Sequence, residues 1–495
     1  MQDVMSGEAC PSQVQLHRTS AARAKVGPND ADMVGVLRRC GVADGQPFVL
    51  GADGSYDVHL NRFFRELDSW GVRSDNGRAA YCRDVMLFCR FLAETRDGTS
   101  IWDRDGEDLR AYKVARLRVD GPHRVSVATW NRSIAALDKW VQWARYEGLL
   151  AAEPFRYADK TVLTPQGLRQ ARVNAEHEPD PQPAPIRFVP FEDYLLWRDV
   201  GLRGELPDGR PDPSWRGRNG ERNAVFADLL VHTGMRLGEA SSLLVGEVPP
   251  LSGARVVGDV HLSAAVTKRG KARTVFTTGR VLRALHHYLE IERDALVVRK
   301  RAEDVYARAA DVDVVRGAGR HALTLADRRG SWSYAKLGVA ARRRLVRRDE
   351  SGQPAEPLWL WLGEDGRPLA SASWQAVFRR ANQRCARFGL GLDIHPHTLR
   401  HTYAVHMLGL LLRQTVRALG EREDRQLTRA QVKRLLIGNP MRKLQLLLGH
   451  SQESSVYAYL DVLDAAQEIV FAALAEWDAQ NVVLDQVKVD AAAAA

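Results

Sequence analysis

The chain has 495 residues, of which 45% are hydrophobic and 27% charged, and its formal net charge is +10. This length predicts two or three domains, and the composition is typical of a soluble globular protein. No apolar run reaches the roughly 18 residues of a transmembrane helix, and the opening "MQDVMSGEAC" lacks the basic and apolar regions of a secretory signal. We therefore expect a cytoplasmic protein with no membrane partner.

The surplus of basic residues favours a polyanionic partner such as nucleic acid, because arginine stays charged and its planar fork fits phosphate. A high-GC genome that encodes arginine in place of lysine is the alternative explanation of the arginine content. The five cysteines are scattered and form no CxxC pair. This pattern predicts a reducing compartment, no disulfide framework and no cysteine-based zinc site.

In chain order, residues 1–50 are weakly patterned and are interpreted as an N-terminal extension with one short helix near "ADMVGVLRRC". Residues 51–155 predict an all-α domain of four helices, since apolar residues recur at three- and four-residue steps in "VHLNRFFRELDSW" and "RAAYCRDVMLFCRFLAET". Ser126 is a candidate helix cap, and Gly148 is where the last helix should end. The prolines of "PDPQPAP" predict an extended linker over residues 156–187.

A second domain is predicted over residues 188–475, and it opens with helices in "PFEDYLLWRDVGL" and "RNAVFADLLVHTGM". Valine and threonine alternate around "KRGK" in "ARVVGDVHLSAAVTKRGKARTVFTT", which predicts a β-hairpin. From about residue 281 the pattern is mainly helical, and residues 476–495 form a featureless C-terminal tail. The expected fold class is therefore mainly α with a small antiparallel sheet, in a two-lobed protein that could clamp around a DNA duplex.

The stretch "HPHTLRHTYAVH" holds four histidines and one arginine at residues 395–406. His397 and His401 lie four apart, as two zinc ligands on one helix face would, but no HExxH motif is present and Arg400 would repel a dication. On a helix, His397 and Arg400 share a face, and this pair suits an anion better than a metal. We therefore expect no metal site. Surface decoration is the alternative for a lone HxxR pattern.

Arg400 belongs to a set of four segments that follow one another along the chain: "HTGMRLGEASSLL", "VTKRGKARTV", "HPHTLRHTYAVHML" and "LLLGHSQESSVYAYL". They carry Arg236, Lys268, His397, Arg400, His450 and Tyr459. The set resembles the catalytic domain of the tyrosine recombinases, or phage integrase family, through most of residues 188–465. "TGMRLGEASSL" is similar to the first arginine box of that family, the histidine stretch to its HxLRH box, and the last segment to its LGH box and nucleophile. Residues 55–155 resemble its helical core-binding domain.

The chemistry explains the residue types. A phosphodiester attacked by a hydroxyl passes through a strongly anionic pentacoordinate state, whose non-bridging oxygens two arginines can hold. Arg236 and Arg400 are expected in this role, with ordinary ion pairing, as between Arg236 and Glu239, as the alternative. The resemblance implies that Glu239 supports and orients the site. The alternative for Glu239 is a solvated carboxylate on a helix face.

The resemblance makes Tyr459 the nucleophile. A free phenol has a pKa near 10, so it needs a nearby base or positive potential, and His397 is the candidate base. Tyr457 is a rival, but the spacing from His450 favours Tyr459 and leaves Tyr457 for the core or scaffold. His450 is expected to hydrogen-bond a phosphate oxygen, with a buried capping histidine as the alternative.

A lysine on the hairpin can protonate the departing 5′ oxygen as a general acid. Lys268 is favoured, and Lys271 in the same turn is the rival. His401 is expected to stabilise the helix, with a supporting role in the site. The expected DNA contacts are Arg132, Arg269, Lys271 and Arg273.

The chain departs from the compact family pattern by two insertions, near residues 296–356 and 409–440. The first carries "ARRRLVRRDE", with five arginines at 342–348 that could track a DNA backbone. A solvated helix face is the alternative. The amphipathic "DAAQEIVFAALAEWDAQ" could dock on a neighbouring protomer or pack on its own domain.

The resemblance implies a site-specific DNA recombinase or integrase of a bacterial mobile genetic element. It would act without metal, nucleotide or other cofactor through a 3′-phosphotyrosyl intermediate. The implied partners are double-stranded DNA, a homotetramer in the synaptic complex, and an accessory DNA-bending or directionality factor, in the cytoplasm and on the nucleoid. A type IB topoisomerase and a non-catalytic DNA-binding protein of the same fold are the alternatives.

Overall fold

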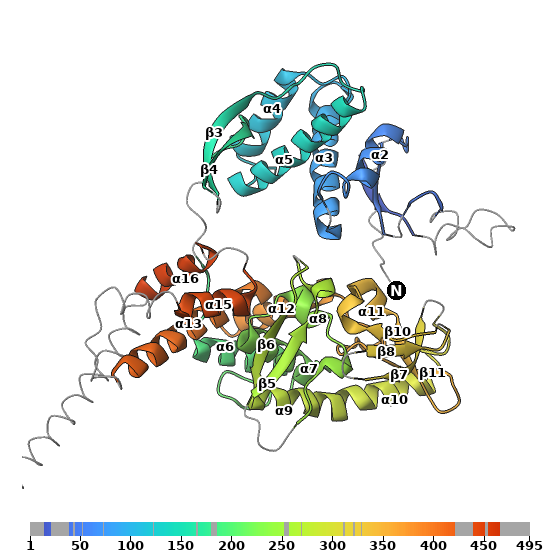
Figure 1. Ribbon diagram of the computed structural model, residues 1–495, viewed down its shortest axis with the longest axis vertical. Helices are drawn as coiled ribbons and strands as arrows, with labels where there is room; N and C mark the ends of the chain where they lie inside the picture. Colours follow the sequence, from blue (N-terminus) through green and yellow to red (C-terminus); the bar gives the residue numbers. More distant parts are fainter. Residues whose placement is uncertain are drawn as a thin grey trace, which may run out of the picture. The chain divides into compact units, whose positions relative to one another are not determined.

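The computed structural model describes residues 14–20, 39–51, 53–179, 186–420, 439–450 and 454–465, with short gaps at 43–44, 73, 122, 165–166, 252–256, 269, 310–311, 320–321 and 328. The chain divides into two units, Met1–Ala184 and Pro185–Ala495, named here unit 1 and unit 2 (Figure 1). Within the described residues, no helix combines the length and apolar character needed to cross a membrane.

Unit 1 contains the helices that the apolar periodicity predicts: α2 (Val58–Glu66), α3 (Asp75–Thr95), α4 (Gly106–Leu117) and α5 (Val127–Tyr146). Ser126 is confirmed as a cap, since its hydroxyl accepts a hydrogen bond from the Thr129 amide. Gly148 follows α5 with φ of +72°, a conformation that glycine adopts without steric cost. The helices enclose a hydrophobic core whose aromatic members include Phe63, Phe64, Phe88, Trp130, Trp140 and Trp143.

Strands flank the helical stretch of unit 1 on both sides. The expected N-terminal extension supplies β1 (Gln15–Arg18), which pairs antiparallel with β2 (Pro47–Leu50). Val49 is buried in the aromatic core, and Leu16 packs against it. These residues therefore belong to the folded domain, and the prediction of a plain extension is wrong for them. The helix expected near "ADMVGVLRRC" lies almost entirely outside the described residues.

The linker expected over residues 156–187 is also wrong for its first half. Residues there form an antiparallel hairpin of β3 (Tyr157–Thr164) and β4 (Gly167–Asn174). The base of the hairpin is fixed to the helices, because the Tyr157 hydroxyl donates to Asp138 and the Trp130 indole donates to the Glu176 carbonyl at 2.9 Å. The prolines lie only at the end of the segment, and the β-branched residues of β3, Thr161, Val162 and Thr164, favour a strand.

Unit 2 opens with α6 (Phe191–Trp197), the π-helical turn η1 (Arg198–Arg203), α7 (Gly220–Thr233) and α8 (Leu237–Ser241). The predicted hairpin is confirmed as β5 (Val257–Leu262) paired antiparallel with β6 (Arg273–Thr278). Its connection holds the short 3₁₀ turn η3 (Ala264–Val266). Helices follow in α9 (Gly279–His287), the π-helical turn η4 (Tyr288–Arg293) and α10 (Asp294–Ala302).

The first insertion contains a five-stranded sheet, so the prediction of a mainly helical pattern from residue 281 is wrong there. Its strands are β7 (Asp313–Ala318), β8 (Ala322–Leu325), β9 (Trp332–Ser333), β10 (Leu345–Arg348) and β11 (Pro354–Pro357), in the order β11-β10-β7-β8-β9. The β10–β7 pair is parallel and the other pairs are antiparallel. Such short strands carry little periodicity, so the sequence pattern does not predict them.

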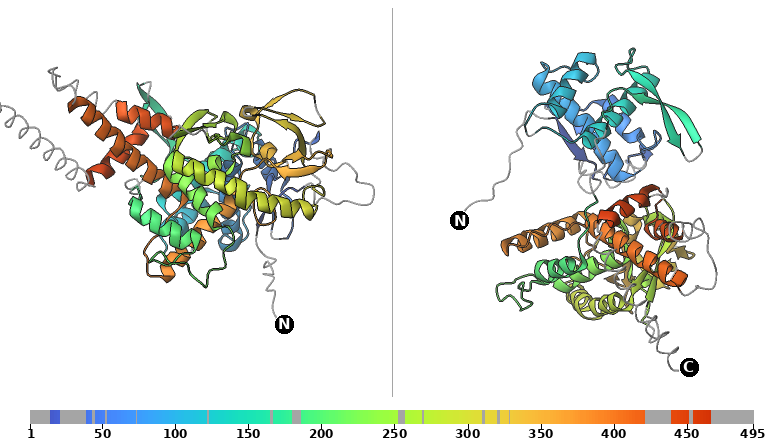
Figure 2. Two further views of the ribbon diagram at one scale, coloured as in Figure 1. Left: turned by 90° about the horizontal axis from the view of Figure 1, so that it is seen from below. Right: turned by 90° about the vertical axis from the view of Figure 1, so that its left-hand side faces the viewer.

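The last described part of unit 2 contains the helices α12 (Ser371–Arg387), α13 (Pro396–Gly420), α15 (Asn439–Leu448) and α16 (Ser454–Ala465). Figures 1 and 2 show α13, α15 and α16 gathered at one side of unit 2, with the five-stranded sheet at the other and β5–β6 between them. The main core of unit 2 centres on Phe226 stacked on Trp374, with ring centroids 3.6 Å apart. The expected class, mainly helical with small sheets, is confirmed.

Candidate active site

Arg400 is held by the carboxyl ends of two helices. It lies on α13, is 3% exposed, and donates hydrogen bonds to the Gly234 carbonyl at the end of α7 and to the Leu448 carbonyl, 2.6 Å away, at the end of α15. The last carbonyls of a helix lack intrahelical donors and carry the negative end of its dipole, so they suit a cation. Two segments far apart in sequence thereby fix one guanidinium.

A glycine is required where α7 meets α13. Gly234 has φ of +63°, and a Cβ there would lie 2.3 Å from the Tyr403 ring. Any side chain would push α13 away and move the carbonyl that holds Arg400. Gly449 after α15 is similar, with φ of +65° and Arg273 atoms 3.1 Å from the Cβ position. The glycines of the "TG" and "LG" pairs therefore allow the arginines to reach these helix ends.

A buried carboxylate organises two further arginines. Glu239 of α8 is 1% exposed, so its alternative interpretation as a solvated helix-face residue is wrong. It accepts hydrogen bonds from the Arg236 amide at 2.8 Å and the Arg236 side chain at 3.1 Å. It also accepts a hydrogen bond from each terminal nitrogen of Arg273, at 2.9 and 2.6 Å. Arg273 in turn donates to the Leu447 carbonyl, 3.1 Å away.

Arg273 is predicted to contact DNA, but in the structure its guanidinium is hydrogen-bonded to Glu239. Its side chain is 9% exposed, against 30% for Arg236. Sequence reasoning gave Glu239 its support role but missed Arg273 as its second partner. The sequence signal for this role was the position of Arg273. It is the first residue of β6, directly after the turn that carries Lys268 and Lys271, named here the lysine turn.

The site holds more positive charge than its carboxylate can neutralise. Burial, followed by repulsion from Arg236, lowers the pKa of Arg400 to about 10. Burial, followed by Arg400, lowers the pKa of His450 to about 4. Burial, followed by His397 and Arg400, lowers the pKa of His401 to about 4. A site of this kind is prepared for an anion, whose charge would relieve the repulsion.

Tyr459 lies beside His401. The Tyr459 hydroxyl and His401 Nδ1 share a hydrogen bond of 3.1 Å, and Tyr459 is 3% exposed in a cluster formed by α13, α15 and α16. Burial raises the pKa of Tyr459, and the charges of Arg400 and Arg236 act in the opposite direction. Tyr457 is 44% exposed, so of the two roles expected for it, core or scaffold, the core role is wrong.

The other histidines surround this pair. The His397 ring lies 4.4 Å from the His401 ring, and the His450 ring lies 6.4 Å from the Tyr459 ring. His397 was the expected base, yet the structure brings His401 to the hydroxyl. The buried Nδ1 atom of His450 has no hydrogen-bond partner among the described residues. It is therefore available to a ligand atom.

The lysine turn lies near the histidines. Burial, then Arg400, lowers the pKa of His397, and Lys268 contributes in the same direction. Lys268 and Lys271 are both exposed, while Arg269 lies outside the described residues. No cluster of three histidine, cysteine or acidic residues suited to a metal occurs in the described part of the chain.

Two predicted sets of DNA contacts lie elsewhere. Arg132 in unit 1 donates to both oxygens of Asp84, at 2.8 and 3.0 Å, and remains half exposed. In the arginine run at 342–348, Arg342 is wholly buried, Arg343 lies 5.4 Å from the Trp359 ring, and Arg344 bonds Asp313 at 3.0 Å. Both interpretations of the run, a DNA track and a solvated helix face, are wrong for Arg342.

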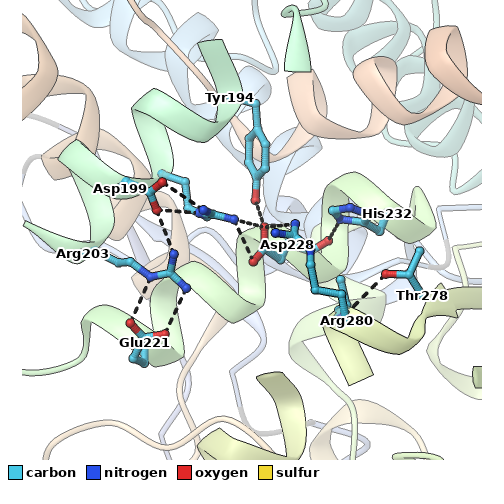
Figure 3. Close-up of polar contacts among 10 residues, drawn as sticks. Tyr194, Asp199, Arg203, Glu221, Asp228, His232, Thr278 and Arg280 are labelled. Carbon is cyan, nitrogen blue, oxygen red and sulfur yellow. Dashed lines mark hydrogen bonds and ion pairs between the residues drawn. The ribbon is translucent and has the colours of Figure 1, made fainter. Parts of the chain in front are cut away.

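A second polar network secures α7, whose end carries Gly234. Figure 3 shows Asp228 of α7 at its centre, with Tyr194, His232 and Arg280 around it. Asp228 accepts hydrogen bonds from the Tyr194 hydroxyl at 2.6 Å and from the Arg198 guanidinium at 3.1 Å. Arg198 also donates a hydrogen bond to Asp199 at 2.8 Å. Buried charges are stable only when paired and hydrogen-bonded, so this network fixes α7 against η1.

Comparisons with known proteins agree with the motifs. Residues 214–412 match the phage integrase family, and residues 60–148 match the phage integrase N-terminal SAM-like domain. The tyrosine recombinase XerD of Corynebacterium glutamicum is 32% identical over 337 residues, or 68% of this chain and 79% of the relative. The tyrosine recombinase XerC of Herpetosiphon aurantiacus is 22% identical over 405 residues, or 81% of this chain and 90% of the relative.

Solved structures with weaker similarity include XerH site-specific recombinase bound to difH substrate in a pre-cleavage complex. It has 13% identity and a TM-score of 0.42, over 84% of this chain and 85% of that one. The Tn1549 transposon integrase in complex with a circular intermediate DNA has 13% identity and a TM-score of 0.43, over 83% and 98%. These scores carry no weight for the assignment, which rests on the sequence relatives. The identity to XerD over most of both chains shows that this chain belongs to the phage integrase family and is a tyrosine recombinase.

Proposed function

We propose that this chain cuts and rejoins double-stranded DNA at specific sites through a 3′-phosphotyrosyl intermediate. The observation that carries the proposal is the Tyr459 hydroxyl, hydrogen-bonded to His401 at 3.1 Å beside a surplus of positive charge. A phenol in that position can attack a phosphate that the arginines hold. A tyrosine ester keeps the energy of the broken phosphodiester bond, so the strands can be rejoined without ATP.

Arg236 and Arg400 bind the non-bridging oxygens of the scissile phosphate. Arg400 is oriented in advance by the Gly234 and Leu448 carbonyls, and Arg236 by Glu239. A preorganised cation stabilises the growing negative charge of the transition state without further rearrangement. The unpartnered Nδ1 of His450 supplies another donor to a phosphate oxygen when it carries a proton.

In the cleavage step, the Tyr459 oxygen bonds to phosphorus as the bond to the 5′ oxygen breaks. The phenolic proton passes to His401, and Lys268 gives a proton to the departing 5′ oxygen, which leaves as a hydroxyl, so the charges balance. His401 is proposed as the acceptor because it contacts the hydroxyl, and His397 is the alternative. His397→Ala and His401→Ala separate the two assignments when cleavage is measured against pH. The variant that lacks the base should regain cleavage as pH rises, because an ionised phenol needs no proton acceptor.

Further features of the proposal follow from the family. Relatives in solved structures include a recombinase bound to its substrate DNA and a dimer of lambda integrase bound to a core site. For this chain we propose double-stranded DNA as the partner, a homotetramer in the synaptic complex, and an accessory DNA-bending factor, acting in the cytoplasm. No metal or cofactor is required by the steps above. Mapping the cut sequence also tests the expectation of a mobile genetic element.

The test is covalent capture on nicked duplexes tiled across the DNA that flanks the gene. A nick near the scissile phosphate lets the short cut strand diffuse away, so the enzyme stays attached. We expect the wild type and Tyr457→Phe to form a protein–DNA adduct that survives denaturation. Tyr459→Phe should bind DNA and form none, because only its hydroxyl is removed.

Undiminished adduct with Tyr459→Phe would overturn the assignment of the nucleophile. DNA binding by the wild type without any adduct would favour the non-catalytic alternative. Relaxation of any supercoiled plasmid by a monomer would favour the type IB topoisomerase.

A further inference from the structure

The five-stranded sheet is linked to the candidate active site through a buried arginine. Arg342 lies on α11 (Val339–Arg343), between β9 and β10, and its residue surface is 0% exposed. Burying a guanidinium is costly unless every N–H is satisfied. The partners of Arg342 therefore show which parts of the fold it holds together.

Arg342 contacts three separate parts of unit 2. Its terminal nitrogens donate to both oxygens of Glu247, at 2.7 and 2.9 Å, and to the Ser242 carbonyl at 3.2 Å. One of them also donates to the Ser263 hydroxyl at 3.1 Å. The remaining bonds go to the carbonyls of Tyr334 and Leu337, at 3.0 and 2.9 Å, within its own segment.

Two of these partners are adjacent to segments that carry site residues. Ser242 ends α8, the helix that carries Glu239. Ser263 follows β5 and begins the connection that holds η3 and Lys268. The turn η5 (Tyr334–Lys336), which follows β9, packs against η3. Arg342 thus joins the end of the Glu239 helix to the root of the loop that carries Lys268.

Lys268 needs such an anchor. It is exposed in the connection between β5 and β6, and the side chain must place its proton within hydrogen-bond reach of the leaving oxygen. Loop residues position reacting groups well only when the surrounding structure fixes them. A displacement of about 1 Å at such a group can reduce a rate by roughly 100-fold.

We propose that Arg342 is a positioning residue, by which the five-stranded sheet sets the reach of the lysine loop toward the leaving 5′ oxygen. The proposal rests on the proposed function, because it takes Lys268 as the proton donor. Arg342 itself touches no reacting atom. Its effect should therefore be confined to the step that needs the proton.

The test compares two leaving groups at the mapped site. One nicked duplex carries the ordinary 5′ oxygen, and the other carries sulfur in its place, which leaves as a stable thiolate and needs no proton. Arg342→Lys keeps the charge but cannot span the same partners. We expect it to slow adduct formation by roughly 10- to 100-fold on the oxygen duplex and by less than about 3-fold on the sulfur duplex.

Ser263→Ala removes only the hydroxyl that Arg342 contacts on the loop, so it should fold and show a smaller loss of the same kind. Arg293→Lys is the matched control. Arg293 is also buried, at 3% exposed, but it bonds Glu356 at 2.6 Å and the carbonyls of Trp359 and Leu360 at 3.2 Å. Any loss in this control should be equal on the two duplexes.

Equal losses on both duplexes for Arg342→Lys would reduce Arg342 to a structural role and overturn the inference. If Arg342→Lys does not fold, Ser263→Ala decides, and an equal loss or no loss there overturns it as well. Lys268→Ala distinguishes failure of the inference about Arg342 from failure of Lys268 as the proton donor. Rescue of Lys268→Ala by sulfur, without rescue of the Arg342 and Ser263 variants, defeats the inference alone. No rescue of Lys268→Ala defeats the assignment of the proton donor and the inference with it.

Discussion

Glu239→Gln tests whether one buried carboxylate organises the site. The substitution keeps the shape and removes the charge that Arg236 and Arg273 share. Arg273 would be left buried without a charged partner, a change that costs about 3–5 kcal/mol in other proteins. Glutamine retains one carbonyl acceptor, so we expect the free energy of unfolding to fall by about 3 kcal/mol.

The same variant should separate DNA binding from cleavage. Removing a negative charge raises the positive potential of the site, so affinity for DNA should stay the same or rise. Cleavage should fall, because Arg236 loses the partner that orients it. A hydrogen bond to a charged group contributes about 1.5–3 kcal/mol, which corresponds to roughly 10- to 100-fold in the rate of adduct formation.

The dependence of stability on pH gives an independent check. Although burial opposes it, the net effect of Arg273 and Arg236 is to lower the pKa of Glu239 below its ordinary value of 4.5. A carboxylate with a lowered pKa stabilises the fold above its unfolded pKa, and this contribution is lost as pH falls through the folded pKa. The difference in stability between wild type and Glu239→Gln should therefore be full at pH 7 and shrink below pH 4.5.

Urea unfolding measures the stability, and covalent capture on the mapped site measures the cleavage. Glu221→Gln is the matched control, because Glu221 pairs with Arg203 at 3.0 Å and is about half exposed. That variant should lose less than about 1 kcal/mol and cleave normally. If the Glu239→Gln protein is as stable as wild type, or loses DNA binding in parallel with cleavage, then Glu239 does not organise the site.

Two further predictions concern the helix ends and the histidines. Gly234→Ala should reduce stability by more than about 1–2 kcal/mol, because φ of +63° is strained and the new Cβ would meet the Tyr403 ring at 2.3 Å; Gly238→Ala, where a Cβ meets no atom within 4 Å, is the control for thermal unfolding. An oxyanion should raise the pKa of His450 from about 4 by offsetting the repulsion of Arg400, so sulfate affinity measured by calorimetry should increase from pH 7 to pH 5. His450→Gln should weaken that dependence, and affinity that is independent of pH in the wild type would contradict the proposed role.

Local signals were enough for the helices of unit 1 and for the β5–β6 hairpin. Apolar periodicity, the Ser126 cap and valine–threonine alternation depend on neighbouring residues, so they can be read along the chain. The β3–β4 hairpin and the five-stranded sheet are not predicted from the sequence, for different reasons. In the five-stranded sheet the strands are short, and β7 pairs in parallel with β10, a partner distant in sequence. The β3–β4 hairpin is a local pairing, but it lies in the segment whose prolines predict a linker.

The boxes carry residue types at the spacing that the chemistry requires, so the family and a set of candidate residues can be predicted from the sequence. How those residues meet depends on the tertiary structure. It brought His401 to Tyr459, placed Arg273 under Glu239 and buried Arg342 between the sheet and the lysine loop. These contacts cannot be predicted along the chain, because charge pairing and burial depend on distances between segments far apart in sequence. An arginine has the same letter whether it faces DNA or a buried carboxylate.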